Sequence, residues 1–262
     1  MSKPRIAILD IETSPIESYT WGLWDQNVGV SQIKTEWSVI SFAAKWLDEK
    51  KVYYSDTAGR GSKKIRDDKA LLGEIWKILD AADIVVAQNG NSFDVKKINA
   101  RLLMHGYGPY SPIRIVDTLT VAKRHFAFTS NKLEWLAKWL TDTKKDEHKE
   151  FPGFELWVQC MADNPKAWRE MRKYNINDVI ATEKLYKKLR PWITNHPNVP
   201  AYSISEAISC PKCGSSNLVK SKNRITQQGS YVQYQCKDCG GYARGKTMEL
   251  TKTKRKNLLV SL

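Results

Sequence analysis

The chain has 262 residues, of which 42 are Lys or Arg and 28 are Asp or Glu, so its formal net charge is +14. With 42% hydrophobic and 10% aromatic residues, this composition excludes a chain that is mainly disordered. No apolar stretch approaches the roughly 18 to 20 residues that span a bilayer, so we expect a soluble, cytoplasmic protein without a signal peptide or membrane partner. A strong positive charge is typical of proteins that bind polyanions, most often nucleic acids, but it identifies no chemistry.

The excess positive charge is concentrated towards the carboxyl end of the chain. Residues 201–262 contain eleven Lys or Arg and three acidic residues, a net charge of +8, and the first 200 residues carry the remaining +6. Three prolines interrupt the helical pattern just before this segment. We therefore predict two domains, over residues 1–192 and 207–262, with a linker over residues 193–206.

The pattern of apolar residues predicts an α/β fold for the first domain. Three strands precede the first long helix, and helices and strands alternate after it, which indicates a mixed five-stranded sheet flanked by helices. The strands are expected at residues 5–12, 39–46, 51–55, 83–88 and 113–116. The helices are expected at residues 68–79, 95–104, 133–140 and 165–190.

Two carboxylates end the first expected strand. Because side chains alternate along a strand, Asp10 and Glu12 lie on one face, and Leu9 and Ile11 lie on the other. Neighbouring carboxylates repel each other and are costly to bury unless a cation lies between them, so a divalent metal ion is one explanation. A strand end that emerges into solvent explains the pair equally well.

Two further segments carry acidic residues on expected helices. Asp94 follows the strand at 83–88 and could simply cap the helix that begins after it. Tyr174 and Asp178 are four residues apart on the last helix, so they share one helical face and can address the same point. An ordinary surface hydrogen bond would produce the same spacing.

In combination, these segments resemble the three signatures of the DEDD superfamily of 3′–5′ exonucleases. The signatures are Asp10-x-Glu12-Thr13, then Asn89-x-x-x-Phe93-Asp94, then Tyr174-x-x-x-Asp178, in this order. The last spacing matches the tyrosine branch, because the histidine branch would need its histidine where Lys173 stands.

The segments Ile115–Thr118 and Leu133–Ala137 resemble the corresponding region of the exonuclease domains of family-B DNA polymerases. The resemblance covers about residues 5 to 190. It implies a ribonuclease H-like fold in which the first strand lies at the centre of the sheet.

The resemblance also implies a catalytic centre with two Mg²⁺ or Mn²⁺ ions. It assigns Asp10 to bridge both ions, Glu12 and Asp178 to complete the first site, and Asp94 to hold the second ion, directly or through water. Tyr174 would orient the attacking water; since a free phenol has a pKa of about 10, a positioning role suits it better than that of a general base. Hard oxygen ligands favour these ions over softer metals.

The resemblance implies that Thr13, Asn89 and Phe93 contact the terminal nucleotide, although Phe93 could equally belong to the core. An aromatic segment, Tyr19–Trp24, follows the first strand. Such rings could stack on unpaired bases. Aromatic residues in a long loop more often pack the loop down, and we expect packing here, as we expect most of the ten tryptophans to lie in the core.

The second domain contains two Cys-x-x-Cys pairs, at Cys210 and Cys213 and at Cys236 and Cys239, separated by 22 residues. This spacing is typical of a zinc ribbon, in which four thiolates hold one structural Zn²⁺ in a closed tetrahedral site. A redox pair is the alternative for a single Cys-x-x-Cys. The segment has few large aliphatic residues, so zinc should supply much of its folding energy. The fifth cysteine, Cys160, is expected to pack in a helical segment.

The sequence therefore favours a metal-dependent 3′–5′ exonuclease whose substrate is nucleic acid, with DNA favoured and RNA as the alternative. The basic ribbon would aid binding to nucleic acid or to a replication or recombination protein. Three other functions stay open: a structure-selective endonuclease, an RNA-processing nuclease with the same centre, and a binding protein without activity. A bacterial, phage or mobile-element setting, in repair or recombination, rests on association alone.

Overall fold

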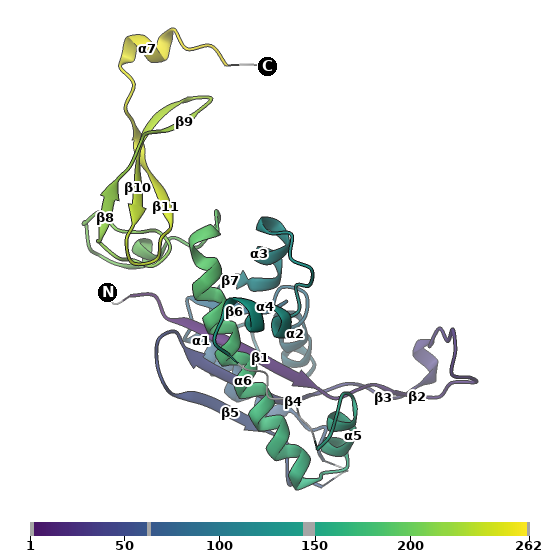
Figure 1. The fold of residues 1–262 in the computed structure, drawn as a ribbon. Helices are drawn as coiled ribbons and strands as arrows, with labels where there is room; N and C mark the ends of the chain where they lie inside the picture. Colours follow the sequence, from purple (N-terminus) through teal and green to yellow (C-terminus); the bar gives the residue numbers. More distant parts are fainter. Residues whose placement is uncertain (1–2, 62–63, 144–149, 261–262) are drawn as a thin grey trace. The chain divides into compact units, whose positions relative to one another are not determined.

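The computed structural model describes residues 3–61, 64–143 and 150–260 (Figure 1). The chain divides into two compact units, Arg5–Tyr186 and, with Met1–Pro4, Lys187–Leu262. The domain limits drawn from the sequence at residues 192 and 207 stay a prediction. Within the described residues, no helix is long and apolar enough to cross a membrane.

The first unit is built on a mixed five-stranded sheet in the order β5-β4-β1-β6-β7, which confirms the predicted fold class. Strand β1 lies at the centre, antiparallel to β4 on one side and parallel to β6 on the other. Each predicted strand is present within two residues of its expected limits. The strands are β1 Ile6–Thr13, β4 Val39–Trp46, β5 Val52–Asp56, β6 Ile84–Ala87 and β7 Arg114–Asp117.

Helices cover both faces of this sheet. On one face, Leu9 and Ile11 of β1 pack in a core with Leu72 and Ile75 of α1 and Ile98 of α2. The helices of this unit are α1 Lys69–Asp80, α2 Asp94–Met104, α3 Thr118–His125, α4 Leu133–Leu140, α5 Glu155–Met161 and α6 Pro165–Leu189, whose last residues belong to the second unit.

On the other face, α5 and α6 pack against β4. Ile40 lies in a second core with Leu156 and Cys160 of α5 and with Trp168 and Met171 of α6. The predicted packing role of Cys160 is thus confirmed, because its side chain is fully buried. The alternation of β1 directs its even-numbered carboxylates away from the first core and towards this face. Figure 1 shows α6 crossing the sheet there.

A two-stranded segment that the sequence did not predict joins β1 to β4. It contains β2 Glu17–Ser18, the 3-10 helix η1 Val30–Gln32 and β3 Ile33–Thr35, and it projects beyond the sheet in Figure 1. The expectation that its aromatic residues pack down was wrong, because Trp21 is 98% exposed and Trp24 is 83% exposed. Two paired strands of two and three residues, which leave no second layer to cover these rings, explain their exposure.

The tryptophans as a group also differ from the expectation that most lie in the core. Only Trp168 of the ten is buried, at 4% exposure. Others pack against the core clusters from a partly exposed position, as Trp37, Trp46 and Trp76 do. An indole ring is large, so one edge usually stays in solvent even when its face is packed.

The second unit carries a small antiparallel sheet in the order β11-β10-β8, with β9 paired to β10. Strand β10 leads directly into the second cysteine pair. The elements of this unit are the 3-10 helices η2 Arg190–Trp192 and η3 Val199–Tyr202, the strands β8 Leu218–Lys220, β9 Arg224–Thr226, β10 Gly229–Cys236 and β11 Tyr242–Met248, and the helix α7 Lys252–Lys256.

Candidate active site

Three carboxylates from two distant segments meet beside the central strand. The ligand oxygens of Asp10 and Glu12 on β1 and of Asp178 on α6 all lie within 4.8 Å of one another. All three side chains are half-buried. The alternation of β1 supplies two of the carboxylates on one face, and α6 crosses that face to supply the third. The acidic centre therefore has a geometry that can hold a divalent cation.

The fourth acidic residue, Asp94, joins this centre through the backbone of β1. Its carboxylate Oδ1 accepts a hydrogen bond from the Ile11 amide at 3.1 Å, and the residue is 2% exposed. The helix-capping explanation does not hold, because Phe93 occupies the N-cap of α2 and no side chain caps the helix there. Asp94 thus points towards the strand that carries Asp10 and Glu12.

Burial and mutual repulsion disfavour the charged forms of these groups. Burial raises the pKa of Asp10 well above its ordinary value, and the charges of Glu12, Asp94 and Asp178 raise it further. Burial likewise raises the pKa of Glu12, with Asp178 and Asp94 adding to the effect. Burial raises the pKa of Asp94 to about 7. A cation bound among these groups would relieve this repulsion, which is what an oxygen-only site for Mg²⁺ or Mn²⁺ requires.

Tyr174 lies next to the acidic centre, one helical turn before Asp178. Burial raises the pKa of its phenol, and the charge of Asp178 and a hydrogen bond to the Asp178 side chain raise it further. The phenol is therefore protonated at neutral pH and can donate a hydrogen bond, but it cannot serve as a base. This agrees with the positioning role that the resemblance implies.

Two residues that the sequence did not single out contact the acidic centre. Asn175 is fully buried on α6, and its side-chain amide donates to Asp10 Oδ2 at 2.5 Å and to the Asp10 carbonyl at 3.3 Å. Trp157 of α5 hydrogen-bonds to the Glu12 carboxylate, and its ring meets that of Tyr174 edge-on at 5.9 Å between centroids. One of these partners orients Asp10, and the other orients Glu12 and Tyr174.

The residues expected to contact substrate lie beyond the carboxyl ends of β1 and β6, which run parallel side by side. Thr13 ends β1, and Asn89 and Phe93 lie in the loop between β6 and α2. This loop is held by Asp117 at the end of β7, whose carboxylate accepts from the amides of Asn89 at 3.0 Å and Asn91 at 3.2 Å. Phe93 is half-buried and packs against the first core, as the alternative core role predicts.

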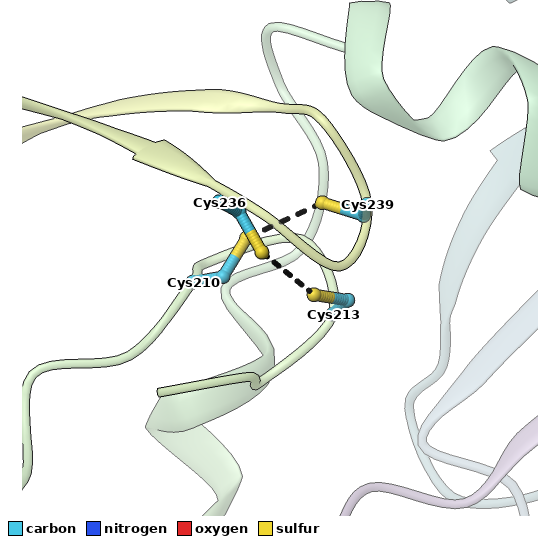
Figure 2. A group of neighbouring side chains, drawn as sticks. All are labelled: Cys210, Cys213, Cys236 and Cys239. Carbon is cyan, nitrogen blue, oxygen red and sulfur yellow. Dashed lines mark hydrogen bonds between the residues drawn. The ribbon is translucent and has the colours of Figure 1, made fainter. Parts of the chain in front are cut away.

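The second unit brings its four predicted cysteines together (Figure 2). The Sγ atoms of Cys210 and Cys239 are 3.6 Å apart, as are those of Cys213 and Cys236. A tetrahedral zinc site with Zn–S bonds of about 2.3 Å separates its sulfurs by about 3.8 Å, whereas a disulfide requires about 2.05 Å. The four thiols therefore fit a zinc ion and are not paired as disulfides.

The two cysteine pairs adopt the same local backbone. The amide of Gly214 donates to the carbonyl of Cys210 at 2.8 Å, and the amide of Gly240 donates to that of Cys236 at 2.9 Å. Each turn returns the second thiol of its pair to the side of the first. This is how two short turns on separate strands present four thiols to one point.

The sheet order and the acidic centre together define a ribonuclease H-like α/β domain. Residues 7–190 match the family model of the RNase_H superfamily, and the chain belongs to this superfamily. This membership supports a nuclease that acts on nucleic acid and uses divalent metal ions.

Among solved structures, the fold is similar to that of the family B DNA polymerase from the hyperthermophilic archaeon Pyrobaculum calidifontis, with 18% sequence identity and a TM-score of 0.53. The match covers 73% of this chain and 25% of the polymerase, so the chain corresponds to about a quarter of the polymerase's length. At this identity the likeness supports the fold alone. A comparison with curated proteins finds no match.

Proposed function

We propose that this protein is a metal-dependent 3′–5′ exonuclease of the tyrosine branch of the DEDD superfamily. The observation that carries the proposal is the convergence of Asp10, Glu12 and Asp178 within 4.8 Å. Asp94 is hydrogen-bonded to the same strand, and Tyr174 stands beside Asp178. These five residues come from three separate segments of the chain, which supports the proposal.

The residues of the acidic centre divide into ligands and positioning groups. Asp10, Glu12 and Asp178 would hold one divalent ion, and Asp10 with Asp94 would hold a second. When bound, such a pair of ions activates water and neutralises the charge that develops on the phosphate. Tyr174 keeps its phenolic proton, which it donates to the Asp178 side chain, and its oxygen would accept a hydrogen bond from the attacking water. Asn175 fixes the rotamer of Asp10 through the bond to Oδ2.

The substrate that we propose is DNA, as a single strand or a free 3′ end. Thr13, Asn89 and Phe93, which lie beyond the carboxyl ends of adjacent parallel strands, would contact the terminal nucleotide. Ligands of α/β proteins commonly bind at this edge of the sheet. The hydrogen bond that the Asn89 amide donates to the Asp117 carboxylate supports this role, because it holds Asn89 in a fixed position.

In the second unit, we propose that Cys210, Cys213, Cys236 and Cys239 bind one structural Zn²⁺ and that the ribbon contributes to nucleic-acid binding. Its net charge of +8 over residues 201–262 suits contact with phosphates. Deleting residues 201–262 should weaken oligonucleotide binding and flatten its dependence on salt. Unchanged binding would assign the ribbon to structure or to a protein partner.

The test of the nuclease activity is digestion of 5′-labelled single-stranded DNA, duplex DNA and RNA with Mg²⁺, Mn²⁺ or EDTA. We expect a descending ladder that requires metal and that disappears in Asp10→Ala and Asp178→Ala. Tyr174→Phe should lower turnover and leave metal binding intact. A single internal cut would instead indicate an endonuclease, and full activity of Asp10→Ala would refute the assignment.

A further inference from the structure

The two-stranded segment between β1 and β4 exposes an unusual concentration of large apolar side chains. We name residues 14–38 the aromatic arm. Every residue from 19 to 31 is exposed. Of the 21 large hydrophobic side chains that are exposed in the described residues, seven lie in the arm: Ile16, Tyr19, Trp21, Leu23, Trp24, Val28 and Val30. Exposed apolar groups at this density mark interaction surfaces more often than ordinary surface.

The aromatic arm is an ordered structure with a clamped base. Arg66 donates to Ser14 Oγ at 2.8 Å, to the carbonyl of Pro15 at 2.9 Å and to Glu17 Oε1 at 2.7 Å. Further out, Tyr19 and Gln32 are joined across the arm by two hydrogen bonds of 2.9 Å. The base therefore holds the arm in a defined direction. The aromatic rings of the arm stay in solvent, whereas in a loosely attached loop they could collapse onto the rest of the protein.

The arm begins where the acidic centre ends. Ser14 directly follows Thr13, the last residue of the strand that carries Asp10 and Glu12. Trp21 lies eight residues beyond Thr13, which is at most about 28 Å of extended chain. A stacked strand rises 3.4 Å per nucleotide, so a strand that ends in the acidic centre needs at most about eight nucleotides to reach Trp21.

The chemistry of the arm fits bases better than phosphates or a large protein. From Tyr19 to Ser31 the single charged residue is Asp25, so this segment would not attract a phosphate backbone. Flat indole and phenol rings stack on the faces of unpaired bases whatever their identity. A stable protein interface uses about 20 to 30 residues on each side, which is more than this narrow segment offers.

We propose that the aromatic arm binds unpaired bases of the nucleic-acid strand whose end occupies the acidic centre, with Trp21 and Trp24 as stacking platforms. This inference rests on the proposed function and deepens it, because it makes a single-stranded segment the part of the substrate that the chain recognises. Phosphate contacts would come from basic residues elsewhere. The arm then contributes affinity that does not depend on salt.

The experiment compares the full-length chain with Trp21→Ala/Trp24→Ala. Fluorescence anisotropy measures binding to labelled dT16, dT4 and a blunt duplex, in buffer free of Mg²⁺ and Mn²⁺ but without a chelator, so that no hydrolysis occurs and the proposed zinc is retained. Trp139→Ala is the matched control, because Trp139 is 66% exposed on α4, outside the arm. Alanine substitution of a stacking ring costs about 1 to 3 kcal/mol, so each tryptophan that stacks should contribute about 5- to 150-fold in affinity.

We expect the double variant to lose affinity for dT16 by at least this factor and to keep its affinity for dT4 and for the duplex. The slope of log affinity against log salt should not change, and Trp139→Ala should bind as the wild type does. Unchanged affinity for dT16 would overturn the inference, as would an equal loss for dT4. The inference would also be overturned if the wild type self-associates while the double variant is monomeric and keeps its affinity for dT16. In that case the arm would bind a second copy of the chain.

Hydrolysis of dT16 by the wild type in Mg²⁺ tests the proposed function separately. If the wild type binds dT16 through the arm but never cleaves it, the exonuclease assignment fails and the arm remains a single-strand binding element. If it cleaves dT16 and the double variant binds equally well, the arm inference fails alone. The two failures are therefore distinguishable.

Discussion

Asn175 offers a sharp test of how the acidic centre is built, because it acts only through another residue. Asn175→Ala removes the two donors that reach Asp10 Oδ2 and the Asp10 carbonyl. It also removes the oxygen that accepts from Ser41 Oγ at 3.2 Å, which leaves a buried hydroxyl without this partner. The carboxylate of Asp10 would then be free to rotate away from Glu12 and Asp178.

The size of the effect follows from the bond that is lost. A hydrogen bond to a charged group contributes about 1.5 to 3 kcal/mol, which corresponds to about 10- to 150-fold in an equilibrium constant. Loss of a group that orients a metal ligand typically lowers metal affinity or activity by about 10- to 100-fold. We therefore expect Asn175→Ala to weaken Mg²⁺ binding, measured by isothermal titration calorimetry, and turnover of dT16 by about 10- to 100-fold.

A graded pair of variants separates orientation of Asp10 from a general packing defect. At the acidic centre, Ser41→Ala removes the neutral bond behind Asn175, worth about 0.5 to 1.5 kcal/mol, so its loss should be about 2- to 10-fold. Asn99→Ala, an exposed asparagine on α2, should change neither readout. If folded Asn175→Ala keeps the Mg²⁺ affinity and turnover of the wild type, or if Ser41→Ala is the more damaging, the reasoning is wrong.

Three further predictions concern the loop before α2, the ribbon and pH. A Cβ at Gly90 would lie 2.6 Å from the Cβ of Ala87, so Gly90→Ala should displace the loop that leads to Asp94 and lower turnover about tenfold or more. The double variant Gly90→Ala/Ala87→Gly removes this clash and should restore much of the lost turnover. A zinc chelator should abolish the circular dichroism of the ribbon strands, with one equivalent of zinc released; full retention of that signal would exclude a zinc-dependent fold. Because the pKa of Asp94 is raised from 3.8 to about 7, its contribution to metal-free stability is greatest below about pH 4 and is lost as the pH rises through 7. Thermal unfolding in buffer free of Mg²⁺ and Mn²⁺, without a chelator, should show this decline, reduced in Asp94→Asn, while the Mg²⁺ affinity of the wild type rises over the same range.

The elements that the sequence predicted share a strong local signal. Residues 39–46 and 133–140 are present with the predicted limits, because their apolar patterns are continuous or strictly periodic. Period two along β1 also placed Asp10 and Glu12 on one face before any contact was known. The helix α3 is as long as α4 but was missed, because its sequence TLTVAKRH has two large apolar residues where LEWLAKWL of α4 has five. The helix α5 has seven residues, about two turns, which is too short for an apolar period to stand out.

The missed positioning residues had no local signal. Asn175 reaches Asp10 across 165 positions of sequence, and an asparagine beside Tyr174 in a helix is unremarkable by itself. The one indication in the sequence was that Asn175 is a polar residue on the face of α6 that packs against the sheet. Trp157 lies in α5, whose packing against α6 brings it to Glu12 and Tyr174. Such contacts depend on how helices are docked, which periodicity does not determine.

Exposure of the aromatic arm escaped prediction for a different reason. The expectation that Trp21 and Trp24 pack down assumed a layer able to cover them. The short pairing of β2 with β3 gives the arm two strands and no second layer. The hydrogen bonds that Arg66 donates to the base of the arm keep the arm from collapsing onto the core. Composition alone cannot distinguish a loop that folds onto the core from one that is anchored outside it.

The two candidate metal centres depend on their ions in opposite ways. The acidic centre stands on β1, whose Ile8, Leu9 and Ile11 are almost fully buried, so the core holds its carboxylates together whether or not a cation is present. Burial raises their pKa values, the resulting repulsion raises them further, and a bound cation would offset both effects.

In the ribbon the relation is reversed. Among the described residues from 207 to 260, the buried hydrophobic side chains are Cys210, Tyr231 and Cys236. So small a set cannot offset the entropy of ordering this segment, and the proposed zinc must supply the difference. Loss of Mg²⁺ should therefore leave both units folded and stop turnover, whereas loss of zinc should unfold the ribbon and leave the acidic centre assembled. A chelator titration that follows turnover and ribbon structure together should show two separate transitions. The fold holds the acidic centre together without its ions, whereas zinc holds the ribbon together, so the two centres have no reason to lose their ions at the same chelator concentration.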